Sequence, residues 1–467
     1  MDGNFLSGCR RTSGALALVI AIGAAAPGHA AERARNVILF IGDGMGVSTL
    51  TAARIFDGQR RGVDGASNRL SFEAFPDLAL VRTYSADSLV TESAAGASAI
   101  LTGRRTLNGA LGVTDKVVRD DCASAKAARV PTLAELAKQA GKATGVVSTA
   151  AITDATPASL YAHTPSRQWQ ADADLPHAAT AAGCVDIARQ MLDGPTALQL
   201  DVMLGGGLAV FTPADGAGRR LDGRDLTAEW RKGGGAYVET ASALSAVPKG
   251  TKRLLGLFAP GNMMRETTRK LSEADAPRLV DMTVKAIEIL FQGEDGFFLM
   301  VEGGLIDKAH HQGLAHEALN ETIELSQAVT AAVAMTNPAE TLIIVTADHS
   351  HGLTINGGAR RTAILGLSPG TDDDPALAVD GKPVPILMYS TGPGAPSPGE
   401  FRPDLSRIDT ADPDQRGLAT IPLASAAHTG EDIAAYAQGP GSERVRGLID
   451  HPAVFQAMRE ALGLPDR

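Results

Sequence analysis

Short apolar runs that end in a polar, glycine or acidic residue alternate along this chain with amphipathic segments of helical length. Five of these runs are rich in β-branched or aromatic residues and span 36–41, 144–147, 201–204, 297–301 and 341–346. Strands separated by helices pair in parallel, because each helix returns the chain to the same end of the sheet. The alternation therefore predicts an α/β fold, with a doubly wound, mostly parallel central sheet flanked by helices.

The composition is typical of one large layered domain. Among 467 residues, 44% are apolar but only 4% are aromatic, so the core must consist mainly of Ala, Val, Leu and Ile. We expect a single domain over 31–467, in which 352–427 is a loop-rich excursion with many Gly and Pro residues before the C-terminal part. A net charge of -10 argues against nucleic acid or an anionic membrane as the main partner, because both select clustered Lys and Arg.

An export signal is predicted over 1–30. Arg10 and Arg11 precede an apolar run at 15–26, and small residues at 28–30 mark the expected cleavage site. A buried N-terminal helix is the alternative. No other stretch is long and apolar enough to span a bilayer, so we expect a periplasmic or secreted protein.

Export to an oxidising compartment makes Cys122 and Cys184 candidates for a disulfide, because they are the two cysteines of the mature chain. A bond between them would stabilise the fold by about 4 kcal/mol in the chain-entropy model. Two free buried thiols are the alternative.

Acidic and histidine residues follow several of the predicted strands, at the edge where doubly wound sheets bind their ligands. The first strand runs into the glycine-rich loop 42–46, which is similar to a nucleotide-binding loop. The glycine spacing differs from that of dinucleotide sites, however, and the charge of Asp43 would repel a phosphate. The conflict disappears if Asp43 binds a cation that in turn binds phosphate; a plain tight turn is the alternative.

Histidines gather near two of the aspartates. Five of the ten histidines lie between His310 and His351, a clustering that buried structural histidines would not produce. Asp307 and His311 are four residues apart, so one helical turn places both on the same face at a distance that suits a shared metal ion. A solvated charged face is the alternative interpretation.

A second oxygen and nitrogen pair, Asp348 and His349, follows the last predicted strand, and His351 is placed to support these ligands through hydrogen bonds. Nitrogen and oxygen ligands without cysteine suit zinc, whereas all-oxygen positions such as Glu302 suit magnesium. We therefore expect bound metal ions at this edge of the sheet.

Ser93 lies in a run of small residues, 93–97, that predicts the first turn of a helix. Free backbone N–H groups and the helix dipole favour an anion at such a place. A simple N-cap is the alternative, and the serine alone does not decide between the two.

Six ordered motifs together resemble alkaline phosphatases, and the resemblance covers nearly the whole mature chain. The motifs are NVILFIGDGMG at 36–46, TESAA at 91–95, DATP at 154–157, VEGGLID at 301–307, TADHSH at 346–351 and HTGE at 428–431. The resemblance implies hydrolysis of phosphate monoesters to an alcohol and inorganic phosphate, and it implies a homodimer.

Matched residue by residue, the resemblance also implies two zinc ions and one magnesium ion. The expected ligands are Asp307, His311 and His428 for one zinc ion, Asp43, Asp348 and His349 for the other, and Asp43, Thr156 and Glu302 for magnesium. Ser93 is the expected nucleophile, which forms a phosphoserine intermediate. Arg167 is expected to grip two phosphate oxygens as a bidentate fork.

Some positions differ within the family pattern. Glu92 stands where the family usually has aspartate before the nucleophile, which affects the orientation of Arg167. Asp154 and Lys308 resemble the choice of bacterial enzymes near the metal ions, whereas the two mature cysteines resemble the disulfide pair of animal enzymes.

Two other classes of function fit part of the pattern. Phosphodiesterases, sulfatases and phosphomutases can share a bimetal fold, but Arg167 argues against diesters because it would grip two oxygens that only a monoester leaves free. A phosphate-binding or metal-storage protein would explain the ligands but not Ser93 beside them. We therefore expect an enzyme whose substrates are small-molecule phosphate monoesters.

Overall fold

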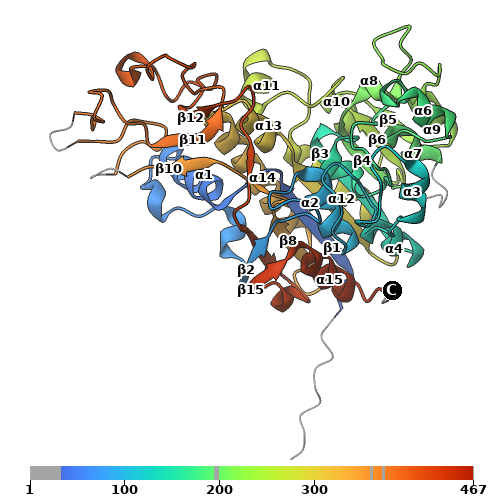
Figure 1. Cartoon of the computed structure of the whole chain (residues 1–467). Helices are drawn as coiled ribbons and strands as arrows, with labels where there is room; N and C mark the ends of the chain where they lie inside the picture. The colour runs from blue at the N-terminus through green and yellow to red at the C-terminus, as the bar shows by residue number, and fades with distance from the viewer. Residues whose placement is uncertain (1–32, 194–198, 358–360, 371–373, 466–467) are drawn as a thin grey trace, which may run out of the picture. The chain divides into compact units, whose positions relative to one another are not determined.

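A ten-stranded sheet runs through the protein, and its strands are labelled in Figure 1. In order across the sheet they are β15 (Gly447–Asp450), β2 (Asp77–Arg82), β14 (Ile433–Gln438), β8 (Thr341–Thr346), β1 (Asn36–Gly42), β7 (Phe297–Gly303), β3 (Ala143–Ala151), β4 (Val202–Gly206), β6 (Leu254–Leu257) and β5 (Ala236–Val238). Only β14 pairs antiparallel with its neighbours, β2 and β8. The predicted α/β fold with a mostly parallel sheet is confirmed.

This computed structural model describes residues 33–193, 199–357, 361–370 and 374–465. The predicted export signal at 1–30 lies outside these residues. From residue 32 onward the chain forms one unit.

The central strands are hydrophobic along their whole length because helices cover both faces of a parallel sheet. Every residue of β1 and of β7 is buried. The five predicted runs correspond to β1, β3, β4, β7 and β8, but the run at 144–147 is much shorter than β3. The polar residues that follow it still belong to the strand because their hydroxyls have partners inside the fold: Ser148 donates to Glu302, and Thr149 accepts from the N–H of Leu305 at 3.1 Å.

Helices of varied length surround the sheet (Figure 1). They are α1 (Val47–Arg60), α2 (Ser93–Thr102), α3 (Cys122–Ala127), α4 (Leu133–Gln139), α5 (Ala155–Ala158), α6 (His177–Ala181), α7 (Ile187–Asp193), α8 (Leu208–Phe211), α9 (Leu226–Lys232), α10 (Ala241–Ser245), α11 (Glu266–Ser272), α12 (Leu279–Leu290), α13 (Leu305–His311), α14 (Ala315–Met335) and α15 (His451–Ala461). Helices α12 and α14 pack against each other and onto the central strands β1, β3, β4 and β7. None of the helices in the described ranges is long and apolar enough to cross a membrane.

The excursion predicted at 352–427 contains regular structure of its own. Strands β10 (Leu353–Ile355), β11 (Leu387–Gly392) and β12 (Ala419–Pro422) form a three-stranded sheet. Immediately before and after the excursion, β9 (Ser350–His351) pairs with β13 (His428–Thr429). The two ends of the excursion therefore meet.

The predicted disulfide is confirmed. Cys122 and Cys184 are bonded, with their Cα atoms 5.7 Å apart. The bond joins the first residue of α3 to the turn that follows α6, two segments separated by 62 residues in the chain.

Candidate active site

Four neighbouring strands, β8, β1, β7 and β3, end at the same edge of the sheet and carry the acidic residues singled out above. Asp43 directly follows β1, Glu302 is the next-to-last residue of β7, and Asp348 follows β8 by two residues. Carboxyl ends of parallel strands lie side by side, so the topology alone brings these three carboxylates together.

A glycine turn joins two of these strand ends. Gly44 has a positive φ of 67°, and its N–H donates to Asp348 Oδ1 at 3.1 Å. A Cβ at this position would lie 2.6 Å from a ring carbon of His351. The turn after β1 therefore requires glycine both for its backbone conformation and for the close approach of the histidine.

One group of ligand atoms gathers around Asp307. Helix α13 places Asp307 and His311 on one face, and the β9–β13 pair brings His351 and His428 opposite each other. Nε2 of His311 lies 3.1 Å from Nε2 of His428, and Asp307 Oδ1 lies 3.3 Å from the first nitrogen and 3.5 Å from the second. Three potential ligand atoms therefore converge on one point.

Hydrogen bonds outside this group orient two of the rings. Nδ1 of His311 lies 2.7 Å from the carbonyl oxygen of Ala426, so a proton on Nδ1 leaves the Nε2 lone pair directed at the group. Nε2 of His351 lies 2.7 Å from Asp307 Oδ1, so this histidine contacts Asp307 rather than the Asp348 and His349 pair beside it in sequence. The neighbouring His310 faces away, between Thr49 and Tyr389, and packs as a core residue.

A second group surrounds Ser93. Nε2 of His349 lies 3.2 Å from Asp43 Oδ1, and the Ser93 hydroxyl lies 3.3 Å from the same nitrogen and 3.5 Å from the same oxygen. Asp43, Asp348 and His349 are all completely buried or nearly so, and their ligand atoms lie within 4.8 Å of one another.

Glu302 and Thr156 border this second group. The hydroxyl of Thr156, on α5, donates to Asp348 Oδ2 at 3.4 Å. Glu302 is buried and accepts a hydrogen bond from Ser148, its register partner on β3. Burial and the nearby charge of Asp43 raise the pKa of Glu302 well above its ordinary value.

The charges of these groups fit divalent cations. Burial, and then the charges of Asp307 and Asp348, raise the pKa of Asp43 to about 6. Buried like charges oppose ionisation, and a cation between them removes that opposition. Imidazole and carboxylate donors that converge at this spacing suit zinc, and the hydroxyl and carboxylate oxygens of Thr156 and Glu302 suit magnesium.

Ser93 is buried at the first position of α2, as the small-residue run predicts. Glu92 caps this helix, because its side chain accepts the N–H of Ala94 at 3.1 Å and that of Ala95 at 2.9 Å. Glu92 therefore occupies these two N–H donors. The expectation that the free N–H groups in the first turn of this helix bind an anion is wrong for these two groups.

Arg167 is held between two carboxylates. Its Nη1 donates to Glu92 at 2.6 Å and its Nη2 to Asp154 at 2.8 Å. Lys308 Nζ in turn lies 3.1 Å from both Asp154 and Asp307, so a chain of alternating charges connects Glu92 with the first group of ligands. The extra methylene of Glu92 does not prevent contact with Arg167.

The model of the alkaline phosphatase family matches residues 34–464. The chain belongs to the alkaline phosphatase family. It is 40% identical over 446 residues to the tissue-nonspecific alkaline phosphatase of Gallus gallus, and the match covers 92% of this chain and 84% of that protein. It is also similar to the crystal structure of the Thermus thermophilus alkaline phosphatase, with a TM-score of 0.68, 28% identity and coverage of 93% of each chain. A variant of the alkaline phosphatase from the Antarctic bacterium TAB5, with Mg bound, has a TM-score of 0.66 at 25% identity and covers 93% of this chain and 99% of that one.

Alkaline phosphatases are metal-dependent hydrolases, and this chain is accordingly a metal-dependent hydrolase of phosphate monoesters. In this family member the predicted metal ligands and Ser93 lie in or beside the two groups of ligand atoms, and Arg167 connects to the first group through Asp154 and Lys308. Sequence reasoning missed Ser148, which contacts Glu302, and the Ala426 carbonyl, which orients His311. The register of β3 against β7 would have identified Ser148 as a neighbour of Glu302, because the two residues are paired. Nothing in the sequence identifies the Ala426 carbonyl as the partner of His311.

A hollow of about 510 Å³ opens beside Arg167. Its walls include Glu92, Asn108, Arg119 and Gln168. Because Arg167 and Glu92 form part of its lining, the hollow lies next to the arginine that is expected to bind phosphate, and its volume suits the alcohol portion of a small phosphate monoester.

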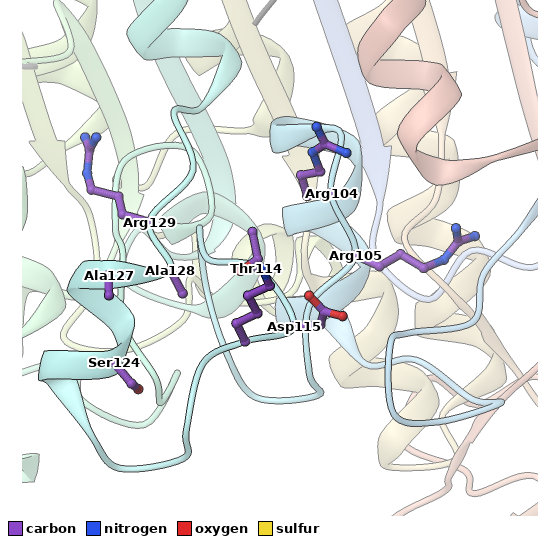
Figure 2. A pocket seen from close by; sticks show the side chains of 9 residues that line it. Arg104, Arg105, Thr114, Asp115, Ser124, Ala127, Ala128 and Arg129 are labelled. Atoms are coloured by element: carbon purple, nitrogen blue, oxygen red, sulfur yellow. The ribbon is translucent and has the colours of Figure 1, made fainter.

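A separate basic hollow of about 530 Å³ lies near the C-terminal end of α2, whereas Ser93 is at the N-terminal end of this helix (Figure 2). Arg104 and Arg105 follow the C-terminus of this ten-residue helix, which spans about 15 Å at 1.5 Å per residue. Figure 2 shows that the guanidinium groups of Arg104, Arg105 and Arg129 point in different directions and not toward one another. The hollow is therefore not part of the catalytic centre and does not form a convergent anion site.

Proposed function

We propose that this enzyme hydrolyses small-molecule phosphate monoesters through a phosphoserine at Ser93. The position of the Ser93 hydroxyl carries the proposal: it is buried, it lies 3.3 Å from His349 and 3.5 Å from Asp43, and it faces the strand ends where the ligand atoms gather. A serine that only capped its helix would use its hydroxyl on the backbone N–H groups, but Glu92 accepts those.

The proposed ligand sets follow from the two groups of atoms and from Glu302 with Thr156. Asp307, His311 and His428 would hold one zinc ion, Asp43, Asp348 and His349 the second, and Asp43, Thr156 and Glu302 a magnesium ion. When bound, the metal ions supply Lewis-acid stabilisation of the attacking and leaving oxygens. His351 would act on the first set by holding Asp307 in place through its 2.7 Å contact.

In the first half of the reaction Ser93 Oγ attacks phosphorus and loses its proton, while the bond from phosphorus to the alcohol oxygen breaks. The alcohol leaves after taking up a proton. Water then attacks the phosphoserine, which releases inorganic phosphate and restores the serine hydroxyl. Arg167 would stabilise the equatorial phosphate oxygens in both steps, since only two of its five N–H groups are engaged by Glu92 and Asp154.

His349 is a poor candidate for a general base, although it lies next to Ser93. Burial alone would lower its pKa, but the charges of Asp348 and Asp43 raise the pKa of His349 to about 10. An imidazole with this pKa is already protonated at neutral pH, and one that binds a metal ion has no lone pair left for the serine proton. A serine and histidine mechanism without metal ions is therefore not favoured.

Mass spectrometry of acid-quenched enzyme tests the intermediate. We expect phosphate on the peptide that contains Ser93 after mixing with substrate, and we expect Ser93→Ala to lose most of its activity while it keeps its fold. Ser48→Ala is a matched control, because Ser48 lies in the first turn of α1 and its hydroxyl makes no hydrogen bond within the described ranges. Normal turnover by Ser93→Ala, without phosphate on this peptide, would show that water is the nucleophile.

We further propose that the enzyme is exported to the periplasm or secreted, and that it forms a homodimer. The charged and apolar pattern of residues 1–30 supports export. Leu78 and Leu80 on β2 and Leu448 on β15 support association, because they are 51%, 46% and 58% exposed, and Leu80 and Leu448 are register partners. N-terminal sequencing of the mature protein and light scattering of Leu80→Lys test these proposals: a chain that begins at Met1, or a monomeric native protein, would contradict them.

A further inference from the structure

The last residues of β3 depart from regular strand pairing at the point where this strand passes Glu302. Strands β3 and β4 pair in register up to Val147, and the register has shifted where the pairing resumes at Ala151. Residues 148–150 therefore form an irregular stretch, of the kind that redirects side chains next to active sites.

Ser148 lies in this stretch and donates a hydrogen bond to Glu302. The N–H of Ala150 donates to Ser148 Oγ at 2.8 Å, so the hydroxyl oxygen already accepts one hydrogen bond. The hydroxyl hydrogen is directed at Oε2 of Glu302, the register partner of Ser148 on β7. Both residues are buried, at 0% and 1% exposed, so solvent does not compete for this contact. The direction of the donor is therefore fixed by the backbone of β3.

The two carboxylate oxygens of Glu302 have different surroundings. Oε2 accepts the Ser148 hydroxyl, whereas Oε1 accepts no hydrogen bond within the described ranges. A Cβ at Gly304 would lie 3.0 Å from Oε1, so the lack of a side chain at this position leaves space beside that oxygen. The protein thus holds one oxygen of Glu302 and leaves the other to a cation.

We infer that Ser148 makes the Glu302 site selective for magnesium over calcium. The inference rests on the proposed magnesium set of Asp43, Thr156 and Glu302. Magnesium requires a small octahedral shell, to which a carboxylate contributes one oxygen, whereas calcium also accepts both oxygens of one carboxylate. Because Ser148 engages Oε2, Glu302 offers only Oε1. Ser148 is therefore a positioning residue that acts through Glu302 and is not itself a ligand.

Cation titrations of the zinc-loaded enzyme without substrate test this role. Calorimetry measures the affinity for Mg²⁺ and, in a separate titration, the affinity for Ca²⁺. Ser148→Ala should weaken Mg²⁺ by about tenfold and leave Ca²⁺ unchanged or bound more tightly, because Oε2 becomes available. Equal weakening of both cations, which a general loss of packing would produce, or an unchanged affinity for Mg²⁺, would overturn the inference.

Two further variants at position 148 and one control complete the comparison. Ser148→Thr keeps the hydroxyl and should keep the preference for Mg²⁺. Should the Ala variant not fold, Ser148→Gly removes the same donor and must show the same loss of selectivity. Thr144→Val is the matched control, because the Thr144 hydroxyl is also buried on β3 but makes no hydrogen bond in the described part of the chain. Its removal should change neither affinity.

Glu302→Ala distinguishes a failure of this inference from a failure of the proposed metal set. The variant should weaken Mg²⁺ more than Ser148→Ala does, because it removes the ligand itself. An unchanged Mg²⁺ affinity in Glu302→Ala would refute the proposed magnesium set and the inference with it. A weakened Mg²⁺ affinity in Glu302→Ala, together with an unchanged ratio of Mg²⁺ to Ca²⁺ affinity in Ser148→Ala, would refute only the role of Ser148.

Discussion

Buried carboxylates occur in two regions of this protein, and each region deals with their charge differently. At the edge of the sheet, the oxygens of Asp43, Asp307 and Asp348 face histidine nitrogens and one another. Between α11 and α14 a second set is just as buried, at 5%, 1%, 3% and 4% exposed for Glu266, Glu317, Glu321 and Glu324.

Arginines neutralise the helical set directly. Arg269 binds Glu266 through two hydrogen bonds of 2.6 and 2.7 Å, and Arg278 binds Glu324 at 2.8 Å. No arginine among the described residues pairs with Glu321, which accepts the N–H of Glu266 at 2.8 Å. Burial and the charges of its neighbours raise the pKa of Glu321 to about 8, so a proton neutralises it at neutral pH. A cluster of buried acidic residues thus does not by itself indicate a metal site. A metal site is indicated when carboxylate and histidine ligand atoms converge with no arginine between them.

Removal of metal ions should have the largest effect and should distinguish the two regions most sharply. A chelator should lower activity by more than about a hundredfold, with recovery on addition of zinc and magnesium. The set that contains Asp43 and His349 lies beside the Ser93 hydroxyl, so we assign the other set, which contains His428, to the leaving oxygen. His428→Ala should therefore impair alkyl phosphates more than activated aryl phosphates. Kinetics with both substrate types measures this.

The exposed His177→Ala is the control for the histidine variant. Full activity of the metal-free enzyme would remove the distinction between the two sets of carboxylates.

Glu321→Gln should stabilise the protein increasingly as the pH rises. In the folded state Glu321 holds its proton up to a pKa of about 8, whereas in the unfolded chain it loses the proton near 4.5. The stability that this proton contributes is complete below 4.5 and is lost as the pH rises toward 8. Between these limits the advantage of the variant should grow by about 1.4 kcal/mol per pH unit.

Urea denaturation from pH 5 to pH 9 measures that advantage, with the exposed Glu288→Gln as the matched control. A difference in unfolding free energy that does not change with pH would mean that Glu321 is ionised in the fold.

Arg269→Met should destabilise the helical set by about 2 kcal/mol, because it removes two short hydrogen bonds and leaves the buried Glu266 with Lys270 at 3.2 Å and Arg278 at 3.7 Å. Activity should not change, since neither residue contacts the catalytic edge. Denaturation and steady-state kinetics on the same preparation separate these effects. A loss of kcat without a loss of stability would contradict the independence of the two regions.

Lys308→Ala should have the smallest effect. Its ammonium lies 3.1 Å from Asp154 and Asp307, so its removal should weaken product phosphate and strengthen magnesium, each by about threefold to tenfold. Equilibrium titrations with phosphate and with magnesium measure the two changes, and Lys285→Ala, whose ammonium pairs with Glu288, is the control. Unchanged affinities would show that Lys308 serves only to space the two aspartates.

The sequence predicts the central strands and the site well because the same local pattern produces both. A buried parallel strand is mostly apolar, and the acidic residue that follows it lies at the catalytic edge, as Asp43 and Asp348 do. The local sequence pattern does not predict contacts between residues that are far apart in the chain. The four-residue spacing selects His311 as the partner of Asp307, but nothing local predicts that the adjacent His310 contacts Thr49 and Tyr389.

The spacing of Glu317, Glu321 and Glu324 also fails to predict where these residues lie in the fold. This spacing places the three glutamates on one face of α14, and a row of charged residues along one helix face is typical of a surface exposed to solvent. The residues that cover this face come from segments about 50 residues earlier, as the pairs Arg278 with Glu324 and Thr267 with Glu317 show. No local pattern predicts that packing, and so the sequence did not identify the second buried set.

The pairing of His351 with His428 closes the chain between them into a loop with a fixed stem. A loop closed at its base can change in length at little energetic cost, because the closure entropy grows only with the logarithm of its length. The three-stranded sheet inside it can therefore be shortened, enlarged or replaced without displacing the two histidines at the stem. The exceptions are residues of this segment that contact the catalytic edge, such as Tyr389 beside His310 and the Ala426 carbonyl that orients His311.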